Sequence, residues 1–189
     1  MSFMLLGILN SQAAGGGGGG FDLLETTTLT SSASSVTFSG LDSYAADYKH
    51  LQIRYTARSD RSSGVYSIAG IRLNSDTGSN YSYHQLYGTG SSVGSTAAAN
   101  QTTMRLGIIP ESTDSANVFG SGIVDLLDFT NTSKNTTIKS FSGEESGSNS
   151  DISLWSGAWY NTAAVTTAQL IDLAGNFVAG SRFSLYGVK

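Results

Sequence analysis

Apolar and polar side chains alternate along most of the chain after residue 20, in segments bounded by Gly, Ser and Asn. This alternation predicts half-buried β-strands, because successive side chains of a strand point to opposite faces. The clearest example is the segment 48–58. Its inward face would consist of Leu51, Ile53, Tyr55 and Ala57, and its outward face of Gln52, Arg54, Thr56 and Arg58.

Similar patterns predict strands over 34–41, 65–74, 81–88, 103–110, 116–129, 136–143, 151–161, 165–173 and 175–189. In the segment 65–74 the apolar positions change face at Ala69-Gly70, which indicates a β-bulge. In the segment 116–129 the pattern groups Ile123 with Val118, Leu127 and Phe129.

The segment 89–101 consists mostly of small residues and predicts a long loop. The segment 144–150 predicts a turn, with Glu144 and Glu145 at its solvated tip. One or two helical turns are expected within 41–48, and no segment has the apolar spacing of a longer amphipathic helix.

Short strands separated by turn residues predict an all-β protein with a single antiparallel β-sandwich of jelly-roll type. We expect three parts: an apolar anchor peptide over 1–14, a polyglycine linker over 15–20 and the sandwich domain over 21–189. The first two parts would form an extended N-terminal arm. No repeat of fixed period is present, which argues against a propeller or a solenoid.

The apolar run at residues 3–9 is too short for a transmembrane helix, which needs about 20 apolar residues. A cleaved leader is disfavoured because no Lys or Arg precedes Lys49, and the glycine run lacks the strand and helix that flank a phosphate-binding loop. We therefore expect a peptide that docks on a partner protein. Its anchoring side chains would be Phe3, Leu5, Leu6, Ile8 and Leu9.

Composition narrows the function further. The 189 residues include 10 Lys and Arg against 14 Asp and Glu, for a net charge of −4, which argues against nucleic-acid binding. Cysteine is absent, so disulfides, thiol catalysis and cysteine-ligated zinc are excluded. Abundant Gly, Ser, Thr and Asn with a single proline suit a β protein with many turns.

Candidate chemistry is sparse. His50 and His84 are the two histidines, and they have no nearby ligand set in the sequence, so we predict no metal site and no cofactor. No G-x-S-x-G motif lies at a predicted strand-to-helix turn, as a serine nucleophile of that type requires, and Asp125 and Asp128 cannot share one face of a regular strand. We therefore predict no catalytic residues and expect the protein not to be an enzyme.

The aromatic residues allow two interpretations. Trp155, Trp159 and Tyr160 could form a sugar-stacking platform or an interface hot spot, or could be core anchors. Tyr81, Tyr83 and Tyr87 share one face of their strand and could form a subunit interface or pack at the core edge.

Five stretches, in order along nearly the whole chain, resemble short β-rich virion surface proteins of marine tailed bacteriophages, including cyanophages. These stretches are LLGILNSQ, YKHLQIRYTAR, NVFGSGIVDLLDF, SGAWYNTAAVTT and GNF…SRFSLYGVK.

The resemblance implies a non-enzymatic capsid decoration, knob or fibre protein on the virion surface, assembled in the bacterial host cytoplasm. Its expected partners are capsid or tail proteins bound through the N-terminal arm and further copies of itself, with a trimer favoured, and neither nucleic acid nor membrane. Two alternatives stay open: a tail-tip module that binds a receptor or host-surface glycan, and a secreted bacterial β-sandwich with a cleaved leader.

Overall fold

The computed structural model describes residues 20–147 and 150–189. Within these ranges the regular elements are antiparallel β-strands and a single turn of 3₁₀ helix, η1 (Leu41–Tyr44). The predicted all-β sandwich is therefore confirmed. The anchor peptide and nearly all of the polyglycine linker lie outside the described residues.

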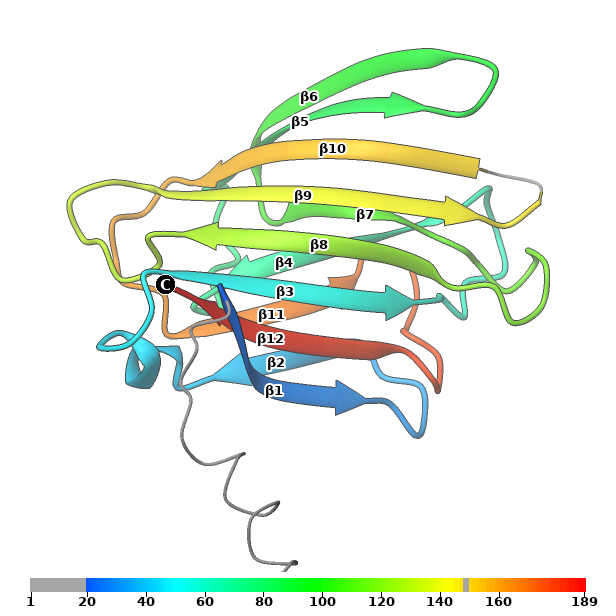
Figure 1. The fold of residues 1–189 in the computed structure, drawn as a ribbon. Helices are drawn as coiled ribbons and strands as arrows, with labels where there is room; N and C mark the ends of the chain where they lie inside the picture. The colour runs from blue at the N-terminus through cyan, green and yellow to red at the C-terminus, as the bar shows by residue number, and fades with distance from the viewer. Residues whose placement is uncertain (1–19, 148–149) are drawn as a thin grey trace, which may run out of the picture.

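Two sheets make up the sandwich, and Figure 1 shows the smaller one behind the larger one. The larger sheet has eight strands in the order β1-β12-β3-β8-β9-β10-β5-β6. In that order the strands are β1 (Phe21–Thr28), β12 (Arg182–Val188), β3 (His50–Ala57), β8 (Gly120–Leu127), β9 (Thr136–Glu145), β10 (Ser150–Trp159), β5 (Tyr81–Gly88) and β6 (Val93–Gln101). The smaller sheet consists of β2 (Ser35–Ser39), β11 (Thr167–Asp172), β4 (Ser67–Leu73) and β7 (Met104–Ile109).

The hydrophobic core lies between the two sheets and follows the predicted alternation. In β3 the side chains of Leu51, Ile53, Tyr55 and Ala57 are buried, as expected. β12 pairs with β3 and contributes Phe183 and Leu185 to the same core. The predicted bulge in β4 is also confirmed, because the register with β7 shifts between Ala69 and Gly70.

One predicted loop is a strand instead, and one predicted turn is shorter than expected. Most of the segment 89–101 forms β6, which pairs with β5 at the end of the large sheet. β6 needs no apolar side chains because most of its residues are exposed, and backbone hydrogen bonds to β5 are sufficient to hold it. β9 continues to Glu145 and places Glu144 on the inner face with 7% exposure, so the prediction of a solvated Glu144 is wrong.

Arg58 was predicted to face solvent but is buried, with 8% exposure. Its guanidinium Nη1 donates to the carbonyl oxygens of Ser115 at 2.7 Å and Val118 at 2.9 Å, and Nη2 donates to that of Asp114 at 2.9 Å. Arg58 lies just past the end of β3, where the strand alternation no longer applies. Its hydrogen bonds hold the loop that leads into β8.

In the described part of the chain, no helix is long and apolar enough to cross a membrane.

Candidate functional site

Four large apolar side chains lie in one line across the outer face of the large sheet. The strand register pairs Ile123 of β8 with Phe141 of β9, Phe141 with Leu154 of β10, and Leu154 with Leu86 of β5. These side chains are 41%, 47%, 54% and 58% exposed, in the order Ile123, Phe141, Leu154 and Leu86. We call these four residues the apolar row.

The apolar row lies on the outer face because other side chains of the same strands occupy the inner face. In β10, Ile152 and Leu154 alternate with Asp151, Ser153 and Trp155, and the strand buries the face that carries the tryptophan. Only one face of such a strand can contact the small sheet, so Leu154 is left outside.

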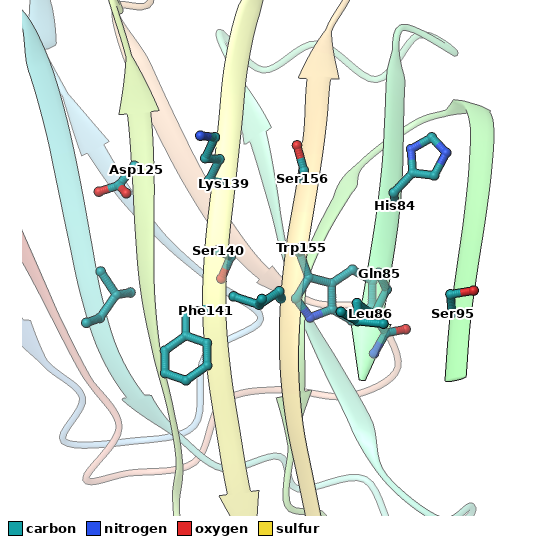
Figure 2. Close-up of a pocket in the computed structure, with 12 residues that line it drawn as sticks. His84, Gln85, Leu86, Ser95, Asp125, Lys139, Ser140, Phe141, Trp155 and Ser156 are labelled. Atoms are coloured by element: carbon teal, nitrogen blue, oxygen red, sulfur yellow. The ribbon is translucent and has the colours of Figure 1, made fainter. Parts of the chain in front are cut away.

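Two shallow hollows flank the apolar row. One, of about 590 Å³, is lined by all four members of the row. Figure 2 shows the polar residues Asp125, Lys139, Ser156 and His84 in a row above Phe141 and Leu86. The second hollow, of about 790 Å³, is also lined by Ile123 and Phe141 and extends to Ile152, which is 56% exposed. The apolar surface therefore extends over adjacent rows of the sheet.

The polar residues beside the apolar row carry both signs of charge. Asp125 and Lys139 are direct neighbours across β8 and β9. Asp125 accepts a hydrogen bond of 2.8 Å from Nε2 of Gln52, whose Oε1 accepts one of 2.8 Å from Nε of Arg54. The Arg54 guanidinium also lies 4.5 Å from the centre of the Tyr186 ring. These contacts hold Asp125 and Arg54 beside the apolar row, and Lys139 lies next to Asp125. Charges of both signs beside apolar side chains suit contact with another protein surface.

The aromatic residues singled out in the sequence are mostly structural. Tyr81, Tyr83, Trp155 and Trp159 are between 0% and 4% exposed, so in this structure they form no exposed platform. Tyr83 meets Trp155 edge to face at 5.6 Å between ring centres. Tyr87 is half-buried, and Tyr160 is 54% exposed, so Tyr160 alone of the six is mostly accessible.

The anchor residues Phe3, Leu5, Leu6, Ile8 and Leu9 lie outside the described residues. His84 lies exposed on the outer face. His50 is half-buried, and its Nδ1 accepts a hydrogen bond of 2.9 Å from the backbone N–H of Asp128. In residues 20–147 and 150–189, no three His, Asp or Glu side chains gather as a metal site requires.

Sequence reasoning missed the apolar row. It grouped Ile123 with Val118, Leu127 and Phe129, whereas β8 buries Val124 and Leu126 and leaves Ile123 outside. The odd spacing between Ile138 and Phe141 in β9 was the available signal, because residues three apart in a strand face opposite sides.

No protein-family model matches the chain, and no curated protein matches its sequence. A function must therefore be argued from the geometry of these surfaces.

Proposed function

We propose that the protein is a non-enzymatic structural component of a tailed-phage virion, displayed on the particle surface as a capsid decoration, knob or fibre. In this proposal the N-terminal peptide anchors each chain to a capsid or tail protein. Neighbouring copies of the sandwich pack against one another through the apolar row. The observation that carries the proposal is this line of four exposed apolar side chains across four adjacent strands.

Scattered exposed apolar residues are ordinary, but a contiguous apolar surface favours an interaction site. Each member of the row is about half-buried already, so complete burial would contribute about 1 kcal/mol per side chain before ordering costs.

A second copy of the chain is the occupant that we propose for this surface. Asp125 and Lys139 lie side by side along the apolar row, so a cyclic contact around a threefold axis can bring Lys139 of each copy to Asp125 of the next. An apolar row with charges of both signs beside it can thus contact the same surface of a neighbouring copy. A strongly charged partner would gain little from this surface.

Assembly in many copies also fits the rest of the sequence. The absence of cysteine suits assembly in a reducing cytoplasm. One short anchor per chain is sufficient when several chains bind together, because each bound anchor raises the effective concentration of the others. Four or five buried anchor side chains would supply roughly 6–12 kcal/mol before ordering costs.

Incorporation into particles tests the proposal directly. In the phage that encodes the chain, we expect a variant lacking residues 1–20 to fold but to be absent from purified virions. The double variant Phe141→Ser, Leu154→Ser should fold and incorporate poorly. The control Val65→Ser changes an equally exposed apolar side chain, at 59%, that lines neither hollow, and it should incorporate normally. Normal incorporation of the truncated chain, or absence of the unaltered chain from purified virions, would overturn the proposal.

A further inference from the structure

A third hollow, of about 570 Å³, lies on the inner side of the large sheet, where the small sheet ends. β7 is the last strand of the small sheet, whereas the large sheet continues beyond β10 through β5 and β6. Figure 1 shows the β5–β6 hairpin at the upper edge of the molecule. The hollow is lined by residues of β5, β6, β7, β9 and β10 and by Tyr66 and Ile68.

Two carboxyl groups lie side by side in this hollow. Glu144 of β9 and Asp151 of β10 are direct cross-strand neighbours, and they are only 7% and 8% exposed. Such neighbours have Cβ atoms about 5 Å apart. The hydroxyl of Ser153 donates to Asp151 and in turn accepts 2.9 Å from Nε2 of Gln85, so a polar chain holds Asp151 in place.

Glu144 and Trp155 have polar atoms left without partners. Neither side-chain oxygen of Glu144 accepts a hydrogen bond of good geometry. The Ser146 hydroxyl lowers the pKa of Glu144, but burial of the carboxyl group has the larger effect and raises it. The indole Nε1 of Trp155, at 3% exposure, has no acceptor within reach. Buried polar groups without partners are rare, because each costs about 1–3 kcal/mol. Both residues line the hollow, so an acceptor and a donor without partners lie within its wall.

The donor and acceptor together restrict the class of ligand. A metal ion or an ammonium group would satisfy the carboxylates but could not accept a hydrogen bond from the Trp155 indole. A hydroxyl group both donates and accepts, and the rings of Tyr87, which is half-buried, and Tyr66, which is 39% exposed, offer apolar surface to the C–H groups of a sugar ring. The two adjacent carboxyl groups outnumber the one cation of the lining, Arg105, and disfavour an anionic sugar.

We propose that this hollow binds a neutral saccharide, with Glu144 and Asp151 accepting from its hydroxyl groups and Trp155 Nε1 donating to one of them. This function goes beyond display on a particle, because it gives the displayed domain a ligand of its own. It does not require the apolar row, which lies on the opposite face of the sheet.

Saturation-transfer NMR with the full chain tests the proposal, using glucose, galactose, mannose, N-acetylglucosamine and N-acetylgalactosamine, followed by an array of neutral oligosaccharides. We expect at least one neutral saccharide to bind. Trp155→Phe keeps the ring and removes the N–H, and Glu144→Gln keeps the size and removes the charge. Each should weaken binding by about tenfold. Glu145→Gln, on the opposite face of β9, should leave binding unchanged.

Three results would overturn the proposal: no binding by any sugar on the array, binding that survives both Trp155→Phe and Glu144→Gln in folded protein, or binding of Ca²⁺ but of no sugar. Circular dichroism of each variant confirms that it is folded. The molar mass of the same samples reports the oligomeric state independently, so failure of this proposal and failure of the proposed assembly role are distinguishable.

Discussion

Single side chains hold the loops of this sandwich by making several hydrogen bonds each. Asp76, in the turn between β4 and β5, accepts from Nε1 of the buried Trp159 at 2.7 Å, from Nδ2 of Asn80 at 2.8 Å and from the backbone N–H of Gly78 at 2.7 Å. The hydrogen bond from Asn80 contributes most to lowering the pKa of Asp76, followed by that from Trp159. Asp76 therefore links a surface turn to a core tryptophan.

Replacing Asp76 should destabilise the fold more than replacing an ordinary surface carboxylate. Asp76→Ala leaves the Trp159 N–H without its acceptor, and we expect a loss of about 1–3 kcal/mol in the free energy of unfolding. Urea denaturation measures this loss. Asp47→Ala, at an exposed position after η1, is the matched control and should change stability by less than about 0.5 kcal/mol. Equal effects of the two substitutions would contradict the assigned role of Asp76.

Glu144 should make stability depend on pH. Burial raises the pKa of Glu144 from its ordinary value of 4.5 to about 7, and the carboxylates of Asp114, Asp151 and Glu145 act in the same direction. Arg105 of β7 lines the hollow that contains Glu144 and Asp151, and it is the one positively charged residue of that lining. Between pH 4.5 and about pH 7, the folded chain therefore binds more protons at Glu144 than the unfolded chain does. Stability is therefore greatest at the acidic end and falls as pH rises through the window.

The thermal midpoint of the wild-type protein should accordingly decrease from pH 5 to pH 8 relative to that of Glu144→Gln, which cannot ionise at this position. The raised pKa of Asp151, also caused mainly by burial, leaves a smaller slope of the same sign in the variant. Differential scanning calorimetry at several pH values measures both slopes. Parallel curves for the two proteins would show that Glu144 does not titrate differently on folding.

At the scale of the strand, close packing between neighbouring elements depends on particular glycines. A Cβ on Gly157 of β10 would lie 2.1 Å from the backbone oxygen of Ser82 and 2.8 Å from the sulfur of Met104. Backbone cannot move away as a flexible side chain can, so β5 and β10 must separate to accommodate even a methyl group.

Gly157→Ala should therefore cost about 1–3 kcal/mol in the free energy of unfolding through overpacking. Gly143→Ala, in the neighbouring strand β9, is the control, because its Cβ would meet only the Asp151 backbone oxygen at an ordinary 3.4 Å. Chemical denaturation of both variants measures the difference. If Gly157→Ala is no less stable than Gly143→Ala, the strands are less tightly packed than the structure indicates.

Strands with one apolar face were predictable, and strands without one were not. The alternation in β3 identified Leu51 and Ile53 as core residues because burial along that strand is decided by side-chain type. β6 has no such signal, since its pairing with β5 is made by the backbone. The spacing of Ile138 and Phe141 indicates that one of them faces outward but not which one, because in β9 the buried face also includes Ser140, Ser142 and Glu144.

At the scale of the whole molecule, the two faces of the large sheet have different proposed roles. The apolar row on the outer face would join copies of the chain, and the hollow beyond β7 on the inner face would bind a saccharide. The sequence predicted the sandwich and an oligomer but did not locate the apolar row. Of the aromatic residues that it singled out, Trp155 and Tyr87 line the hollow. The N-terminal anchor stays a prediction from the sequence alone.

The molar mass of the full chain in solution tests the central claim most directly. Light scattering over a dilution series should give a multiple of the 19.7 kDa chain mass, three for the favoured trimer, and Phe141→Ser with Leu154→Ser should lower it towards one chain. A mass of one chain at every concentration, or an oligomer that the double substitution leaves intact, would contradict the proposal that the apolar row joins copies of this protein.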